Sequence, residues 1–448
     1  MNRALAEAVV GCLSVSEERP QVDALRKFRL RDWQRTFKWL DRSGLTLYLL
    51  QRLKSINATQ LLPPPVLTRF EQNLADNRRR VDYLASEFRS LNERFDHAGL
   101  KYAAIKGFSL VPAYCPNAVL RAPSDLDYLV EHKSLPVAQR VLEEAGYCLQ
   151  RFSDIEFKYG RPSSKIPTVS DDPFSRETEP SVDLHLTFWN WKLNRVPLNE
   201  PEFRLDQTIE HDWQGLPFPV LNDDDAFVLQ ILHIFQHTLE GWVKLSSLLE
   251  MGYFLKARRS HTHFWNRVNV RVGEVPYLAE FAAVVMGLAK RAFAAPMPLV
   301  AAKWTQCVRP SARLWLQNYG RRWAIEEHPY DSSSLLSATK LSVFLHQQFV
   351  PDPTVRKQIT QQRLLPWKRP AALSTDNAAA TSLTARQLQS WSVLQRLISD
   401  LGSSSRYVLE LARWIRLHRL AGAHKSHQPA SASTCDLSHQ ELLPTHRQ

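Results

Sequence analysis

Apolar residues recur with a helical period along the first part of the chain. Trp33, Phe37 and Leu40 are spaced four and three residues apart, so their side chains fall on one face of a helix. After a run of three prolines, apolar and charged residues alternate with the same period from 66 to 98. The pattern predicts an N-terminal helical region over residues 1–96.

After Gly99 the spacing of apolar residues changes from one typical of helices to one typical of strands. Short alternating or apolar runs predict strands at 100–105, 125–130, 147–152 and 181–188. Between them, a helical pattern ends at Gly146, a residue that suits the end of a helix. Polar, proline-rich residues predict a loop over 160–180. Strands interleaved with short helices predict a small α/β or α+β domain over residues 97–220.

Helical patterns return in the C-terminal half of the chain. Asn222 is followed by three aspartates, which favour a helix start because acidic groups stabilise the positive end of the helix dipole. We expect a helical region over 221–365 that packs on the core, then a linker and a basic helix over 366–420. The polar residues 421–448 are typical of a disordered tail.

Composition narrows the class of protein. Hydrophobic residues make up 44% of the 448 residues, enough for a large buried core. Lys and Arg number 57 against 45 Asp and Glu, and the net charge of +12 favours anionic partners such as nucleotides, nucleic acid or a membrane surface. No apolar run reaches the roughly 20 residues of a membrane span, and the five cysteines form no CxxC pair. A cytoplasmic protein in a reducing compartment is therefore expected.

Two aspartates open the second predicted strand. Asp125 and Asp127 flank Leu126, and side chains alternate along a strand. The two carboxylates therefore point the same way, with Cα atoms about 6.6 Å apart, while the leucine points into the core. Carboxylate oxygens are ligands that Mg²⁺ prefers, often together with substrate phosphates. The pair suggests a magnesium site, although two surface acids at a strand start would give the same pattern.

A third carboxylate lies on the last predicted strand of the core. In this alternating run, Asp183 and His185 form the polar face between apolar positions. If this strand lies beside that of Asp125 and Asp127, three acids meet and can hold two cations about 3.5–4 Å apart. The alternative is an ordinary hydrogen-bonded acid at Asp183. We expect His185 to support the site rather than to bind metal.

Lys106 and Gly107 stand between a predicted strand and a predicted short helix. The N-terminus of a helix presents free backbone N–H groups to a phosphate, and a lysine adds a positive charge. The hydroxyl of Ser109 could join them. The same residues also fit a common strand-to-helix turn that binds no ligand.

Taken in order, these motifs resemble the uncharacterised nucleotidyltransferase family of the polymerase-β-like superfamily. The residues that carry the resemblance are 104–107 (AIKG), Arg121, 125–127 (DLD), 145–147 (AGY) and 182–185 (VDLH). The family has a Leu-Lys-Gly segment, an arginine ahead of an Asp-x-Asp strand, a Gly-Tyr pair after a helix and a Val-Asp-Leu-His strand. Order and approximate spacing agree across residues 100–190, with Ile105 in place of leucine, and the resemblance extends more weakly over about 25–300.

The resemblance implies an α+β fold, in which a small mixed-sheet nucleotidyltransferase core is flanked by N- and C-terminal helical regions. It also implies transfer of a nucleoside monophosphate from an NTP, such as ATP, with release of pyrophosphate and with two Mg²⁺ ions as cofactors. The acceptor stays open among a small molecule, a protein and an RNA, and the oligomeric state stays open as well.

The resemblance also implies roles for individual residues. By this resemblance, the metal-binding and catalytic residues would be Asp125, Asp127 and Asp183. The nucleotide-binding residues would be Lys106, Gly107, Ser109 and Arg121. Asp183 would help to activate the acceptor hydroxyl, and Arg121 would either neutralise phosphate charge or brace the aspartate strand. The wider superfamily has a Gly-Ser pair where this chain has Gly107 and Phe108, so only Ser109 is left to supply a hydroxyl.

A second hypothesis is a non-catalytic protein that keeps the fold as a scaffold or binding module for a nucleotide, an RNA or a protein. The three intact aspartates favour the enzyme. His233 and His237 lie one helical turn apart, but the segment is not HExxH and has no evident third ligand, so we do not expect a zinc site. Basic residues beside tryptophans, as at Arg322 and Trp323, would suit RNA but also the outside of any basic helical protein.

Overall fold

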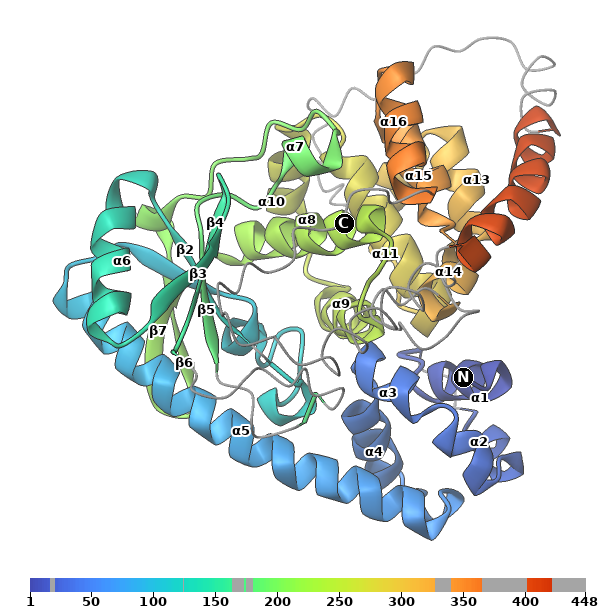
Figure 1. The fold of residues 1–448 in the computed structure, drawn as a ribbon, viewed down its shortest axis with the longest axis horizontal. Helices are drawn as coiled ribbons and strands as arrows, with labels where there is room; N and C mark the ends of the chain where they lie inside the picture. Colours follow the sequence, from blue (N-terminus) through green and yellow to red (C-terminus); the bar gives the residue numbers. More distant parts are fainter. Residues whose placement is uncertain are drawn as a thin grey trace, which may run out of the picture.

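The computed structural model describes most of the chain. The described residues are 1–16, 21–123, 125–162, 173–174, 180–326, 340–364 and 401–420. Within them the fold is α+β, with a seven-stranded mixed sheet between helical regions (Figure 1). The fold class implied by the sequence motifs is therefore confirmed.

The helices predicted for residues 1–96 are present. They are α1 (Arg3–Cys12), α2 (Leu30–Gln34), α3 (Phe37–Ser43), α4 (Thr46–Ser55) and α5 (Pro64–His97), with short 3₁₀ helices η1 (Val22–Lys27) and η2 (Thr59–Leu61). Trp33 is fully buried and meets Phe70 of α5 edge-on, with ring centroids 6.1 Å apart. α5 has 34 residues and runs from these helices along the sheet, so it joins the two regions (Figure 1).

The strands form one mixed sheet in the order β3-β4-β5-β2-β1-β7-β6. They are β1 (Tyr102–Ile105), β2 (Asp125–Val130), β3 (Cys148–Phe152), β4 (Glu156–Gly160), β5 (Ser181–His185), β6 (Ile209–Trp213) and β7 (Leu216–Val220). β2 runs parallel to β5 and β1 parallel to β7, whereas the other neighbours are antiparallel. The four strands predicted from the sequence are all present.

Three strands of the sheet, β4, β6 and β7, were not predicted. β7 contains Pro217 and Pro219, and proline cannot donate a hydrogen bond to a neighbouring strand. β6 and β7 are joined by Gln214 and Gly215, which both have positive φ, as a two-residue hairpin turn requires. β4 has only five residues, and although polar and apolar residues alternate in it, this short run was not recognised as a strand.

Helices make up most of the remaining described chain. They are α6 (Leu135–Glu144), α7 (Trp191–Asn194), α8 (Asp223–Glu240), α9 (Leu245–Arg258), α10 (Thr262–Gly273), α11 (Leu278–Phe293), α12 (Leu299–Cys307), α13 (Pro310–Asn318), α14 (Gly320–Glu326), α15 (Ser342–Phe349) and α16 (Pro353–Leu364). Short 3₁₀ helices are η3 (Gly107–Leu110), η4 (Ala118–Leu120), η5 (His132–Ser134) and η6 (Leu205–Gln207). The Asn222 side chain accepts from the N–H groups of Asp224 and Asp225, so the predicted start of α8 is confirmed.

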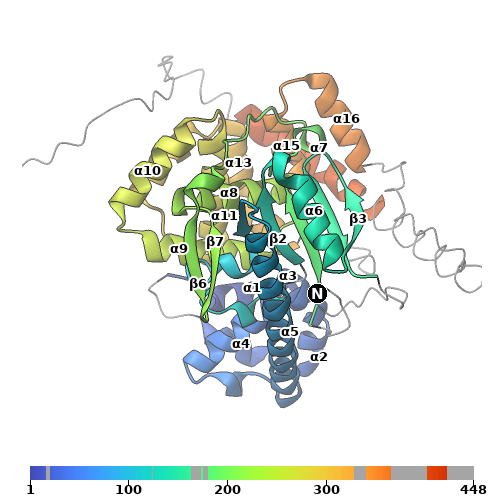
Figure 2. The ribbon, with the colours of Figure 1, turned by 90° about the vertical axis from the view of Figure 1, so that its left-hand side faces the viewer.

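α5 covers one face of the central strands, and the acids lie on the other face. Tyr128 of β2 stacks on Phe88 of α5 with ring centroids 5.8 Å apart, and α6 lies beside α5 (Figure 2). Because side chains alternate along a strand, Asp127 points to the opposite face. There, Leu129 and Leu229 of α8 belong to a small apolar cluster. The acids therefore lie on the face of the sheet towards α8.

Several predictions concern residues outside the described part of the chain. They are most of the loop at 160–180, the linker and first part of the basic helix at 366–400, and the tail at 421–448. Residues 401–420 are helical, as predicted. Among the described helices, none is long and apolar enough to cross a membrane.

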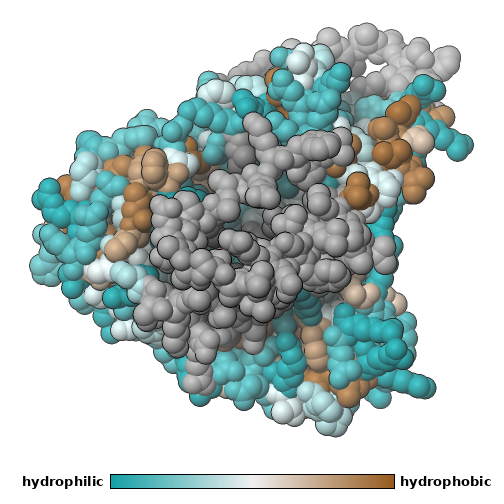
Figure 3. All heavy atoms as spheres, viewed as in Figure 1, coloured by the Kyte–Doolittle hydropathy of each residue, from teal (hydrophilic) through white to brown (hydrophobic). Residues whose placement is uncertain are grey.

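Many basic residues of the helical regions form ion pairs within the protein. Arg258 pairs with Asp223, and Arg321 pairs with Glu7, from which it is separated by 314 residues of sequence. Polar residues dominate the described surface on the face seen in Figure 3, with apolar residues scattered among them. These arginines therefore stabilise contacts between helices, and the basic pairs in the sequence are weaker evidence for an RNA surface than their number suggests.

Candidate active site

Asp127 and Asp183 face each other across two neighbouring parallel strands. They are register partners on β2 and β5, so both side chains leave the sheet on the same face. Each residue is only 5% exposed. Ligand atoms of Asp127, Asp183 and His185 lie within 4.8 Å of one another, close enough to hold a metal ion. The expectation that the two aspartate strands are neighbours is confirmed.

Asp125 lies at the start of β2, at the edge of this group. Its register partner is Ser181, and its side chain lines the same cavity as the other two acids. Asp125 is half-buried and does not belong to the compact three-residue group, in which His185 takes the third place. The structure therefore brings all three predicted carboxylates to one face but packs two of them most closely.

His185 makes a hydrogen bond to one of the acids. Its Nε2 lies 2.8 Å from Oδ1 of Asp127. Because an ionised carboxylate can only accept, Nε2 is the donor in this bond. The ring also stacks on Phe188, with centroids 4.7 Å apart, and this contact holds its orientation. Both contacts fit a residue that orients Asp127.

Lys106 reaches the acids from the end of β1. Its Nζ lies 2.7 Å from Oδ1 of Asp127 and 5.2 Å from the ring centre of Phe188. Its backbone has a φ of 57° and a ψ of −153°, a conformation that costs a non-glycine residue about 1–3 kcal/mol. The Ser109 hydroxyl donates to the Lys106 carbonyl oxygen at 2.7 Å and helps to fix this turn. The short helix predicted after Lys106 is the 3₁₀ helix η3.

Arg121 holds the same turn from the other side. Its guanidinium donates to the Gly107 carbonyl oxygen at 3.1 Å and to Oε1 of Glu250 at 2.9 Å. The Tyr48 hydroxyl donates to the same Glu250 oxygen at 2.6 Å. Burial and the Glu250 charge raise the pKa of Tyr48 well above its ordinary value, so the hydroxyl keeps its proton. Of the two roles open for Arg121, these contacts support bracing, although what it braces is the Gly107 turn.

A second lysine contacts the acids from the neighbouring strand β4. Lys158 stands opposite Asp183 in the antiparallel register of β4 and β5. Its Nζ lies 3.1 Å from each of the two Asp183 carboxylate oxygens. Each of the two most buried acids therefore has its own lysine, Lys106 on one side and Lys158 on the other.

Burial and neighbouring charges move the pKa values of the two buried acids in opposite directions. Burial raises the pKa of Asp183 to about 7; Asp127 and Asp125 add to this shift, and Lys158 opposes it. Burial also raises the pKa of Asp127, but Lys106 and His185 outweigh it and hold the pKa below its ordinary value. Three acids share two lysines, so the cluster has excess negative charge, the condition that favours a bound cation.

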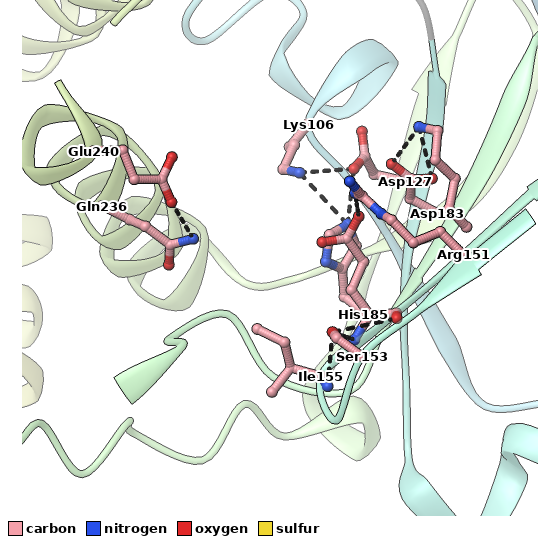
Figure 4. Close-up of polar contacts among 11 residues, drawn as sticks. Lys106, Asp127, Arg151, Ser153, Ile155, Asp183, His185, Gln236 and Glu240 are labelled. Atoms are coloured by element: carbon pink, nitrogen blue, oxygen red, sulfur yellow. Dashed lines mark hydrogen bonds and ion pairs between the residues drawn. The ribbon is translucent and has the colours of Figure 1, made fainter. Parts of the chain in front are cut away.

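The acids open into a cavity of about 950 Å³. The wall opposite the sheet is formed by α8, where Gln236 and Glu240 face the acids across a gap (Figure 4). His237 Nδ1 lies 2.9 Å from one Glu240 oxygen, and Gln236 donates to the other at 3.3 Å. His233 lines the same wall. The cavity is at the upper end of the sizes typical of ligand sites.

Comparison with known protein families matches residues 29–294, more than half of the chain, to a family described as an uncharacterised nucleotidyltransferase. The chain belongs to this nucleotidyltransferase family. The match contains all residues of the site described above and confirms the resemblance seen in the sequence motifs. No curated protein matches the chain.

The site of this nucleotidyltransferase family member fits a divalent metal ion. Asp127 and Asp183 offer buried carboxylate oxygens on one face, with Asp125 beside them. Burial raises the pKa of Asp183, and the negative charges of Asp127 and Asp125 add to this shift. The hydrogen bond from His185 orients Asp127, as metal-ligating carboxylates usually require.

Sequence reasoning did not assign Lys158, Glu240 and Glu250 to the site. Glu240 follows His237 by three residues, a spacing that places the two side chains together on a helix and could have found this pair. Lys158 could be found only by recognising β4 as a strand. Glu250 meets Arg121 across 129 residues of sequence, so no local pattern points to it.

Proposed function

We propose that this protein is a Mg²⁺-dependent nucleotidyltransferase. It would transfer a nucleoside monophosphate from an NTP to a hydroxyl or phosphate of an acceptor and release pyrophosphate. The observation that carries this proposal is the pair of buried carboxylates on adjoining parallel strands, with Lys106 beside them, at the wall of one large cavity. Membership of the family supports the same general reaction.

Three carboxylates would hold the metal ions. These are Asp125, Asp127 and Asp183, which share one face of the sheet. Two Mg²⁺ ions bound there would neutralise the negative charge of the reacting phosphates. His185 would keep Asp127 in place through its hydrogen bond.

The turn after β1 would bind the triphosphate. Lys106 supplies the positive charge, and Gly107 allows the backbone to approach a phosphate closely, since it has a φ of 43°. Ser109 and Arg121 both bond to backbone carbonyls of this turn, so they would hold its shape rather than bind phosphate directly. This arrangement prepares the turn before the nucleotide arrives.

In the transfer step, the acceptor oxygen would form a bond to the α-phosphorus of the NTP. The bond between that phosphorus and the oxygen that bridges to the β-phosphate breaks, and pyrophosphate leaves with the electron pair. Asp183 would take the proton from the acceptor hydroxyl, because it lies on the side of the cluster away from the Lys106 turn. Positioning and charge neutralisation would supply most of the rate.

The test is incubation with Mg²⁺ and each labelled NTP, using a cell extract as the source of acceptor. The wild-type protein should transfer label, whereas the double variant Asp125→Asn/Asp127→Asn should not. Asp225→Asn is a matched control, because Asp225 is equally buried but pairs with Arg271 outside the cavity. Equal labelling by wild type and the double variant would rule out this active site. A wild type that binds NTP but transfers nothing would favour the non-catalytic binding protein.

A further inference from the structure

Lys158 occupies one of the carboxylates that the proposed function assigns to metal. Its Nζ contacts both oxygens of Asp183 at 3.1 Å. The Lys158 side chain is 28% exposed and Asp183 only 7%, and both residues line the cavity. A metal ion that binds Asp183 from the cavity therefore competes with this ammonium group for the carboxylate oxygens.

A metal ion and Lys158 compete for the same two oxygens of Asp183. A Mg²⁺ ion binds carboxylate oxygens directly at about 2.0–2.1 Å, closer than an ammonium group. At such a short separation the divalent ion repels a neighbouring ammonium group. Lys158 has a long, flexible side chain and lines the cavity, so it has room to move away from Asp183.

The place to which Lys158 moves is set by the order of the strands. The sheet runs β4-β5-β2-β1, so Lys158 and the Lys106 turn lie on opposite sides of Asp127 and Asp183. If the Lys106 turn holds the outer phosphates, the α-phosphoryl group lies over the acids, and the next positive charge along the sheet is Lys158. No residue of the β4 strand was assigned a role from the sequence.

We propose that Lys158 passes from Asp183 to the α-phosphoryl group of the NTP when a divalent cation binds. This proposal rests on the proposed function and adds a phosphate-binding residue to it. In the metal-free protein Lys158 compensates part of the Asp183 charge, and in the loaded site it compensates charge on the reacting phosphate. Binding of metal then makes a phosphate-binding group available, so metal and nucleotide bind cooperatively.

The test compares Lys158→Met with wild type by calorimetry, in three titrations. The probes are Mg²⁺ alone, pyrophosphate with Mg²⁺, and the α,β-methylene analogue of whichever of four NTPs the wild type binds most tightly, also with Mg²⁺. Lys158→Met should bind Mg²⁺ alone at least as tightly as wild type, because the competing ammonium group is gone. It should bind the methylene analogue about tenfold or more weakly, since a charged hydrogen bond to phosphate is lost. Its affinity for pyrophosphate should stay within about twofold of wild type.

Two further variants separate this role from a merely structural one. Lys158→Arg keeps the charge and should recover most of the affinity for the analogue. Lys192→Met is a control, because Lys192 forms an exposed ion pair with Asp154 and does not line the cavity. Unchanged affinity of Lys158→Met for the analogue, with tighter Mg²⁺ binding, would overturn the proposal and leave Lys158 as a counter-ion. Wild-type protein that binds neither Mg²⁺ nor any analogue would overturn the proposed function itself, and this proposal with it.

Discussion

Two buried charged clusters lie close together in this protein, and they differ in the balance of their charges. The acid cluster consists of Asp125, Asp127 and Asp183, which share two lysines at the wall of the cavity. The Glu250 network consists of Glu250, Arg121 and Tyr48. In this network one carboxylate meets one guanidinium and one hydroxyl, and all of them bond to protein.

The difference separates the proposed metal site from a network that holds the neighbouring turn in shape. The Glu250 network is balanced in charge, and its bonds run to the Gly107 carbonyl, so it fixes the turn beside the acids. The acid cluster has three carboxylates and two lysines and lies at the cavity wall. Burial raises the pKa of Asp183, and the neighbouring charges of Asp127 and Asp125 add to this shift. Burial of charge alone therefore does not mark a functional site, whereas unbalanced buried charge beside a cavity does.

The largest effect is expected from removing one carboxylate of the acid cluster. Asp127→Asn should lower the rate of nucleotidyl transfer at least about 10⁴-fold, because it removes a ligand of the proposed metal centre and the partner of Lys106. The rate is measured with the labelled NTP that wild type uses. The far-ultraviolet circular dichroism spectrum should stay that of wild type. A rate within tenfold of wild type would place the chemistry elsewhere.

Breaking the Glu250 network should instead reduce stability. Arg121→Met leaves the Glu250 carboxylate, 4% exposed, without its positive partner, so the free energy of unfolding should fall by about 3–5 kcal/mol. Urea denaturation measures the change. The exposed pair Arg26–Asp23 provides the contrast, since Arg26→Met should change stability by less than about 0.5 kcal/mol. Similar losses in the two variants would remove the distinction between buried and exposed pairs.

A smaller effect is expected from the residue that orients the acid cluster. His185→Phe keeps the ring that stacks on Phe188 but removes the hydrogen bond to Asp127. Mg²⁺ affinity should fall about 10–100-fold, the usual cost of losing a group that holds a metal ligand. The matched control is His211→Phe, since His211 packs on Phe218 outside the cavity. Unchanged Mg²⁺ affinity in His185→Phe would show that Asp127 needs no such support.

A further predicted effect is on the pH dependence of metal binding. Burial raises the pKa of Asp183 to about 7, so below that pH the carboxyl group is mostly protonated and Mg²⁺ must displace its proton. Mg²⁺ affinity should therefore rise with pH, by at most about tenfold per unit, between roughly pH 5 and 7, and level off above. Calorimetry over this range measures it. The same pH dependence in Asp183→Asn would assign the proton to another group.

The two clusters differ in how well they could be predicted from the sequence. The acid cluster was predictable, because period-two patterns placed Asp125 and Asp127 on one strand and Asp183 on another. The structure shows that these strands lie side by side as a parallel pair. Lys158 was missed, because β4 has only five residues and was not recognised as a strand.

The Glu250 network could not be predicted from sequence patterns. Tyr48 and Glu250 are 202 residues apart, and their contact depends on how α4 and α9 pack. No periodicity or motif specifies such a contact, since it arises only when helices from both ends of the chain meet at the turn after β1. The acids could therefore be identified from local sequence patterns. The residues that hold the neighbouring turn in shape depend on tertiary packing and could not.

The most direct test of the central claim is a calorimetric titration of Mg²⁺ into three forms of the protein. Wild type should bind Mg²⁺, and Asp225→Asn should bind it equally well, because Asp225 is buried but paired with Arg271 away from the cavity. Asp127→Asn should bind at least about 100-fold more weakly. Equal binding by wild type and Asp127→Asn would contradict the claim that the acid cluster is the metal centre.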